Sequence, residues 1–269
     1  MTSSLTPTDP PPTGGVYISR GVTPRIPVGG LVISIGPDGA PTGSMRLELQ
    51  LDTCIHWLEI AIVQLTEAKA IHEALLAAKA SGATRFDDLD REFKACVQAT
   101  VAAATFFEAL YAAVLERVPT KPATTGQNRH QRPARYAVVT EALRQAFGLR
   151  KQGTANLRGV LKEVYRFRDE AVHPSAKFSD PVPHFTLGVN VERRFVMFSY
   201  PNARQLVRAA LAFSKILVSR DLSRRSKAVQ DFAAYLQTVC GPLYPQWEQT
   251  FGELLDPAPS AASQVAPFK

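Results

Sequence analysis

The sequence predicts a mainly α-helical protein: a helical bundle of about six helices with an inserted β-hairpin and a short N-terminal β excursion. Two observations predict this fold class. From residue 46 onward, apolar residues recur mostly at steps of three and four, which is the period of an amphipathic helix. Alternation with a period of two is confined to short stretches bounded by Gly and Pro. With 269 residues, 45% of them apolar, the chain is long enough to bury one sizeable core.

Composition divides the chain into four regions. Residues 1–15 are rich in Pro, Thr and Ser, and we expect a disordered N-terminal tail there. Residues 16–45 hold two β-branched runs and a Gly-Pro-Asp-Gly turn sequence, which predicts an irregular or β segment. We expect one helical domain over residues 46–255, with a hairpin near 184–199. Residues 256–269 are rich in Ala, Pro and Ser, and a flexible tail is expected.

Within the helical domain, the periodicity predicts six principal helices and a short helical piece at the end. They cover about residues 46–80, 87–118, 134–147, 154–173, 201–220 and 223–240, followed by 246–255. Acidic residues open the second of these helices, where the helix dipole favours negative charge. The fourth helix should end at or just before His173, because Pro174 disfavours helical geometry in the residue that precedes it.

The remaining composition excludes several classes of protein. Cys54, Cys96 and Cys240 are far apart, so neither a disulfide framework nor a cysteine metal site is expected. The N-terminus lacks the basic and apolar regions of a secretory signal. The most apolar run, Val101–Leu115, is shorter than a membrane span and contains Glu108. We therefore expect a soluble, cytoplasmic protein with no membrane contact, no metal and no cofactor.

The positive charge of the chain is concentrated in one region. The chain carries +7 overall, whereas residues 119–168 alone carry eleven basic and two acidic side chains, a net +9. Such a region can bind a phosphate backbone, and RNA is the expected partner. The alternative is a solvated basic face beside a flexible loop. The basic residues expected to contact nucleic acid are Arg129, Arg132, Arg135, Lys162 and Arg166.

The stretch that carries a chemical signal is Y-R-F-R-D-E-A-V-H-P, which contains Arg168, Asp169 and His173. On an ideal helix Arg168 and His173 would lie about 140° apart. The helix end at His173 removes that constraint and lets the imidazole turn toward the guanidinium. A histidine titrates near neutrality and can move a proton, and an arginine offers a planar fork to a phosphate. The alternative is structural: Arg168 would pair with a surface acid and His173 would cap carbonyl groups.

These residues resemble the R-x(4–6)-H motif of the HEPN superfamily, helical-bundle proteins prominent in prokaryotic toxin and anti-phage systems. The spacing alone carries no weight, because a chain this rich in arginine should contain about one such match by chance. The resemblance depends on three further features: the polar residue directly after Arg168, the position at a helix end, and an earlier core helix, A-T-F-F-E-A-L, that contains Glu108. It covers roughly residues 46–180. The hairpin and the C-terminal helices are not part of the family pattern.

The resemblance implies metal-independent RNA cleavage at a composite site formed by two protomers of a homodimer. His173 would then transfer protons at the ribose 2′-hydroxyl, and Arg168 would bind the scissile phosphate. Asp169 would orient one of them, and Glu108 is a secondary catalytic residue. An antitoxin or defence protein is the expected protein partner. Two alternatives stay open: a non-catalytic HEPN-like module that binds nucleotide, RNA or protein, and a scaffold in which the Arg–Asp–His cluster is structural.

Overall fold

The computed structural model describes residues 21–83, 85–118, 133–173, 180–184 and 187–255. The chain divides into two compact units between Asp52 and Thr53. The described part is mainly helical, with eight helices and three small antiparallel strand pairs, so the predicted fold class is confirmed. The tails predicted at 1–15 and 256–269 lie outside the described residues.

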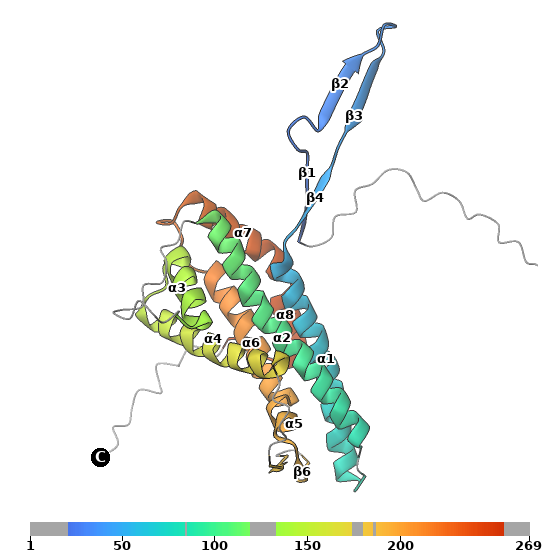
Figure 1. The fold of residues 1–269 in the computed structure, drawn as a ribbon, viewed down its shortest axis with the longest axis vertical. Coiled ribbons are helices and arrows are strands. Elements are labelled where there is room, and N and C mark those ends of the chain that lie inside the picture. The colour runs from blue at the N-terminus through green and yellow to red at the C-terminus, as the bar shows by residue number, and fades with distance from the viewer. Residues whose placement is uncertain (1–20, 84, 119–132, 174–179, 185–186, 256–269) are drawn as a thin grey trace, which may run out of the picture. The chain divides into compact units, whose positions relative to one another are not determined.

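The first unit contains a β-ribbon, called the arm below, over residues 21–52. Its strands are β1 (Val22–Arg25), β2 (Leu31–Ile35), β3 (Pro41–Met45) and β4 (Glu48–Leu51). β2 pairs with β3 and β1 with β4, both antiparallel, which makes a nested hairpin (Figure 1). At the tip, the amide of Gly39 donates to the carbonyl oxygen of Gly36 at 2.9 Å, and Gly39 has a φ of 78° that favours glycine. The β structure expected for this segment is confirmed.

The helix predicted from residue 46 begins later than expected. β4 occupies Glu48–Leu51, and α1 begins only at Thr53. The sequence R-L-E-L-Q-L before it alternates polar residues with leucine, which places the leucines on one face of a strand. Leu51 fits both this alternation and a helical step of four to Ile55, so the helical pattern extends further toward the N-terminus than the helix does.

The second unit is built on two long helices, α1 (Thr53–Ala80) and α2 (Phe86–Arg117), which pack against each other (Figure 1). The chain turns between them at Gly82, whose φ is 74°. The buried face of α2 is rich in alanine, and small side chains let the neighbouring helices approach closely. Acidic residues occupy its first turn, as the sequence predicts.

Two shorter helices, α3 (Arg135–Phe147) and α4 (Lys151–Val172), pack on each other and on α2. Gly148, with a φ of 65°, ends α3 in the left-handed conformation typical of a helix C-terminus. His173 is the C-terminal cap of α4, and its amide donates to the carbonyl oxygen of Asp169 at 2.8 Å. The helix end predicted before Pro174 is confirmed.

The inserted hairpin predicted near 184–199 is present, but it begins earlier and is shorter than expected, and the second half of the predicted range is helical. Only two-residue strands pair here, β5 (Val182–Pro183) with β6 (Asn190–Val191), and the helix α5 (Arg193–Met197) follows. The carboxylate of Glu192 accepts from the amide of Arg194 at 3.0 Å and so caps this helix. Its helical turn allows Phe195 and Phe198 to contact the ring of Phe93, with centroids 5.2 and 5.8 Å away. An alternating pattern does not reveal this tertiary contact.

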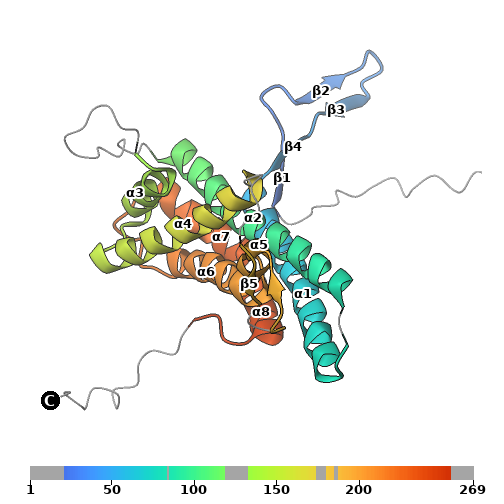
Figure 2. The ribbon, with the colours of Figure 1, turned by 60° about the horizontal axis from the view of Figure 1, so that its bottom comes forward.

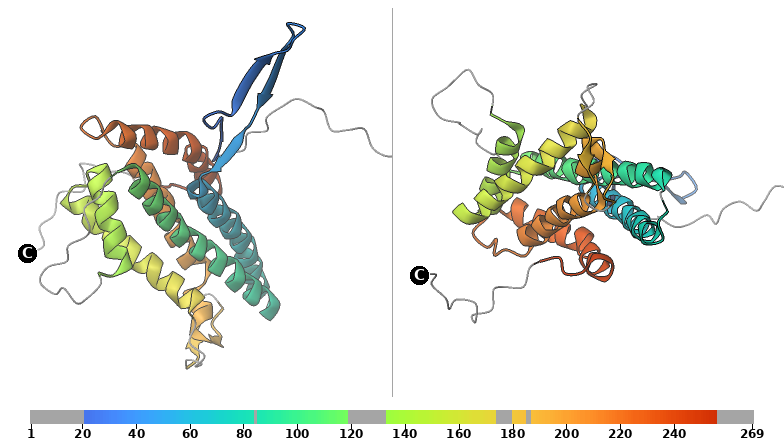
Figure 3. Two further views of the ribbon diagram at one scale, coloured as in Figure 1. Left: turned by 45° about the horizontal axis from the view of Figure 1, so that its top comes forward. Right: turned by 90° about the horizontal axis from the view of Figure 1, so that it is seen from below.

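Three further helices complete the bundle: α6 (Tyr200–Val218), α7 (Lys227–Cys240) and α8 (Leu243–Phe251). In turned views, α4 and α6 run beside α2, and α7 packs on α6 (Figure 2, Figure 3). Apolar side chains from these helices and from α1 to α4 form one continuous core. The largest of the fully buried side chains is Trp247 on α8.

A buried carboxylate joins three of these helices. Glu92 on α2 contacts His72 Nδ1 of α1 at 3.0 Å and accepts from the amide of Tyr200 at the start of α6 at 2.8 Å. Glu92 and His72 are both buried. Hydrogen bonds of this kind offset the cost of keeping a carboxyl group away from water.

Two expectations drawn from composition, for the cysteines and for a membrane span, can be compared with the structure. Cys54, Cys96 and Cys240 are all free thiols and buried. Within the described ranges, one helix, α2, is long and apolar enough for a membrane span, and half of its most apolar window is buried inside the protein. The buried core helix of a soluble bundle has the same two properties.

Candidate active site and nucleic-acid interface

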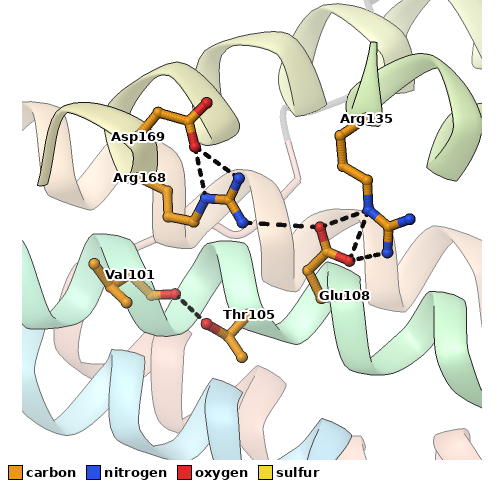
Figure 4. A network of polar contacts seen from close by, with 6 residues as sticks. All are labelled: Val101, Thr105, Glu108, Arg135, Arg168 and Asp169. Atoms are coloured by element: carbon orange, nitrogen blue, oxygen red, sulfur yellow. Dashed lines mark hydrogen bonds and ion pairs between the residues drawn. The ribbon is translucent and has the colours of Figure 1, made fainter. Parts of the chain in front are cut away.

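Glu108 lies at the centre of a polar network between α2, α3 and α4 (Figure 4). Both of its carboxylate oxygens accept from Arg135 at the start of α3: Nε donates to each at 3.0 Å, and Nη2 donates to Oε2. This two-pronged pairing fixes the plane of the guanidinium as well as its position. One turn earlier on α2, the hydroxyl of Thr105 donates to the carbonyl oxygen of Val101 in the same helix at 2.8 Å.

Arg168 approaches the same carboxylate from α4. Its Nη1 lies 4.0 Å from Glu108 Oε1, while Nε and Nη2 donate to Asp169 Oδ1 at 2.9 and 2.6 Å. The guanidinium also lies over the ring of Tyr165, with its carbon 5.1 Å from the centroid. The Arg168 side chain is 28% exposed. It is therefore held from three sides and still reaches solvent.

Arg135 is the main group that keeps Glu108 charged. Burial alone would raise the pKa of this carboxyl group, but the hydrogen bonds and charge of Arg135, with smaller contributions from Tyr165 and Arg168, lower it below its ordinary value of 4.5. Burial, and then the neighbouring Glu108 charge, raise the pKa of Tyr165. Glu108 is thus an anion near neutral pH, suited to orient arginines and unsuited to donate a proton.

His173 lies one step beyond the last residue of α4 and is exposed. Its φ and ψ of −126° and 54° depart from helical values, as the sequence predicts for the residue before Pro174. Within the described chain, no hydrogen bond or ion pair joins the side chains of His173 and Arg168. Of the four catalytic residues predicted, Glu108, Arg168 and Asp169 form one network, and His173 stands apart at the helix end.

The outward face of α4 carries a line of basic side chains. At about 100° per residue, the positions within about 40° of one line along the helix include four cations and, near the end, Asp169, and they lead to His173. These cations and His173 are all exposed. At about 1.5 Å per residue, the line from the first cation to His173 is about 33 Å long. This basic stripe consists of Lys151, Arg158, Lys162 and Arg166, and it ends at His173.

The predicted nucleic-acid-binding residues fall into three groups. Lys162 and Arg166 belong to the basic stripe, although Arg166 also pairs with Glu163 at 2.8 Å. Arg135 is turned toward Glu108 and engaged there. Two others, Arg129 and Arg132, lie outside the described residues.

Sequence reasoning missed two features of this site. One is the ring of Tyr165, which underlies Arg168 and whose spacing of i, i+3 on a helix is a signal that could have indicated it. The other is the pairing of Arg135 with Glu108, 27 residues apart, for which the sequence offers no signal. In the described part of the chain, no group of three or more His, Cys, Asp or Glu side chains is arranged to hold a metal ion.

Comparison with known proteins gives no family assignment. No protein-family model matches the chain, and neither a curated protein nor a solved structure matches it significantly.

Proposed function

We propose that this protein is a HEPN-like, metal-independent RNA endonuclease of the toxin or anti-phage defence type. It acts in the cytoplasm as a homodimer, with Arg168 and His173 as catalytic residues. The observation that carries the proposal is the position of these two residues at the solvent-exposed end of a helix whose outward face is basic. An RNA strand lying along that face would lead its phosphates to the same helix end.

The arrangement around Arg168 suits phosphate chemistry. Asp169 and Glu108 hold the guanidinium from two sides, which reduces the freedom it would lose on binding a phosphate. Charge that develops on the phosphate oxygens during cleavage would be stabilised by a cation already in place. A lysine could not reproduce this role, because it lacks the planar fork.

In the proposed reaction, the 2′-oxygen attacks the adjacent phosphorus and gives up its proton to a base. The bond from phosphorus to the 5′-oxygen breaks, and that oxygen takes up a proton. The products are a 2′,3′-cyclic phosphate and a free 5′-hydroxyl. His173 supplies the proton transfer, because imidazole is the side chain whose titration range spans neutral pH.

A second protomer supplies the missing half of the site. His173 lies beyond the last residue of α4, and among the described residues no hydrogen bond or ion pair joins its side chain to Arg168. A two-fold axis beside the helix end would bring the arginine of one protomer to the histidine of its partner. Each dimer would then contain two composite sites.

The test is cleavage of a labelled single-stranded RNA by the purified full chain, with and without EDTA. We expect cleavage in both conditions and a 2′,3′-cyclic phosphate at the new end. Arg168→Ala and His173→Ala should each lower the rate at least about 100-fold. The matched control is Arg91→Ala, which removes an exposed arginine of α2 that belongs neither to the site nor to the basic stripe. Abolition by EDTA, or full activity in His173→Ala, would refute the proposal.

Mixing the two inactive variants tests whether the site is composite. A mixed dimer has one intact site when arginine and histidine come from different protomers, so random mixing should restore about a quarter of the wild-type rate. If each site used both residues of one protomer, mixing would restore nothing. That result would refute the composite site while leaving the catalytic residues in place.

One observation favours a second function, a non-catalytic module that binds RNA. Arg135 and Arg168 are already engaged by carboxylates within the chain. In that case the basic stripe would bind RNA with a steep dependence on salt, and His173→Ala would bind with unchanged affinity and cleave nothing.

A further inference from the structure

The arm exposes an apolar face of the kind that folded proteins normally cover. In β2, Leu31, Ile33 and Ile35 point to one face, and the antiparallel register places Met45 opposite Leu31 on that face. Their exposed fractions are 56%, 69%, 76% and 58% in that order. All five residues of β2 and all five of β3 are exposed.

The other face of the same ribbon is mostly polar and carries Val32 beside Ser34, Thr42 and Ser44. Ser34 and Thr42 lie opposite each other there, and their hydroxyl groups are 3.0 Å apart. The arm is therefore amphipathic in the way of a strand pair with one buried face. A two-stranded ribbon is at best marginally stable alone in water, and gains stability when its apolar face packs on another layer.

The pattern continues in the second strand pair. Leu49 and Leu51 of β4 share one face and are 66% and 61% exposed. Polar and charged residues occupy the opposite face, where Arg25 is paired in register with Glu48. Arg46 Nη2 also donates to Glu48 Oε1 at 3.0 Å.

Charge decides which occupant fits this face. Residues 21–52 contain Arg25 and Arg46 against Asp38, Glu48 and Asp52, so the arm is slightly acidic in a chain of +7. A nucleic acid or an anionic bilayer would gain nothing from it. An identical apolar face without charges meets neither repulsion nor an unpaired charge.

We propose that the apolar face of the arm packs on the same face of a second copy of this chain. Two ribbons stacked face to face, about 10 Å apart, would bury their Leu, Ile and Met side chains and keep both polar faces in water. Such a contact is self-complementary and closes on two copies. The contact would join the same two protomers that the proposed composite site needs, but the argument for it comes from the arm alone and does not rest on the Arg168–His173 chemistry.

The size of the face sets the strength of the pairing. Four aliphatic side chains on the β2–β3 face and two on the β4 face, each about two-thirds exposed, together offer roughly 400 Å² per arm, or about 800 Å² for a pair. Stable interfaces bury about 1,200–2,000 Å² in total, and smaller contacts are transient. The arms therefore form a reversible dimer whose population depends on concentration.

The experiment compares two substitutions on adjacent residues of β2. Ile33→Asp puts a charge on the apolar face, and Val32→Asp puts the same charge on the other face at a side chain of similar exposure, 52%. Sedimentation velocity of the full chain over a wide concentration range should give a reversible dimer for the wild type and for Val32→Asp. For Ile33→Asp the dissociation constant should rise about 100-fold, because two copies of the charge lose their water.

Cysteine substitutions at the same two positions of β2 test the arm-to-arm contact without introducing a charge. The three native cysteines are buried, so a new thiol on the arm is the one accessible to mild oxidation among the described residues. Ile33→Cys should form disulfide-linked dimers, and Val32→Cys should not. Circular dichroism checks that each variant keeps its helices.

Three outcomes would overturn the proposal. They are a wild type that is monomeric throughout, a dimer that Ile33→Asp leaves intact, and equal cross-linking of the two cysteine variants. An intact dimer in Ile33→Asp would mean that the helices form the interface. RNA cleavage measured on the same samples separates this result from a failure of the proposed enzymatic function.

Discussion

Replacing Glu108 by glutamine tests whether one carboxylate organises the network between α2, α3 and α4. Glutamine keeps the shape of the side chain and one acceptor oxygen but loses the charge that two arginines face. Hydrogen bonds to charged groups contribute about 1.5–3 kcal/mol each, whereas exposed ion pairs contribute about 0.2–1 kcal/mol. The Glu108 side chain is 23% exposed and that of Arg135 45%, so we expect a loss of about 1–1.5 kcal/mol in the free energy of unfolding.

Double-mutant cycles should divide this loss unequally between the two arginines. Arg135 donates directly to both oxygens of Glu108, whereas Arg168 is 4.0 Å from one of them and directs its hydrogen bonds to Asp169. The coupling of Glu108 with Arg135 should be about 1 kcal/mol, and that with Arg168 below about 0.5 kcal/mol. Urea unfolding followed by circular dichroism measures both for the Glu108→Gln, Arg135→Gln and Arg168→Gln single and double variants.

The pH dependence of stability shows whether the charged form of Glu108 is the one that stabilises the protein. The folded pKa of Glu108 is below its ordinary value of 4.5, so its contribution to stability is complete above that pH and is lost as pH falls toward the folded pKa. Wild type and Glu108→Gln should therefore converge in stability on acidification below about pH 4.5. Equal couplings for the two arginines, or a difference between wild type and variant that grows with acid, would refute the reasoning.

Three further predictions concern the core, a buried histidine and the basic stripe. Phe198→Ala should cost about 3–5 kcal/mol in urea unfolding, because this 1% exposed ring packs edge-on against two other phenylalanines; a loss below about 1 kcal/mol would contradict that packing. Burial lowers the pKa of His184 below 6.5, so the unfolded state takes up a proton before the folded state does. The free energy of unfolding should therefore fall as pH drops through about 6.5, and His184→Gln should flatten that part of the curve of stability against pH. A curve unchanged in His184→Gln would exclude this histidine as the cause. Lys162→Gln should make the slope of log affinity for single-stranded RNA against log salt shallower by about 0.7, and an unchanged slope would remove Lys162 from the interface.

Much of the helical architecture could be predicted, because each long helix has an apolar stripe that depends only on local sequence. The ends of α1 and α4 at Ala80 and Val172 agree with the pattern. The start of α1 and the helix α5 could not be predicted in the same way. At the start of α1, one leucine satisfies both a strand and a helix; in α5, a single turn is stabilised by an aromatic contact with Phe93, about one hundred residues earlier.

The residues of the candidate site also differ in how far the sequence alone could indicate them. Arg168, Asp169 and His173 could be grouped from the sequence because they are close in it, and Glu108 was added only through the resemblance to the HEPN motif. The partner of Glu108 was not identifiable, because Arg135 comes near only when α3 packs on α2. Arg135 was expected to contact nucleic acid from its place in a basic stretch, and charge counting cannot distinguish a cation that faces solvent from one that faces a carboxylate.

The low pKa of Glu108 also separates two roles that a carboxylate near a phosphate site can have. A general acid must hold a proton at the working pH, whereas a positioning residue must stay charged, and Glu108 meets the second requirement. If the proposed RNA cleavage is observed, Glu108→Gln should lower kcat about 10-fold and leave the pH–rate profile in place, because Arg168 is less well held while the proton-transfer group is unchanged. Glu108→Asp, which keeps the charge, should recover part of the rate. Loss of one limb of the profile in Glu108→Gln would show instead that this carboxyl group transfers a proton.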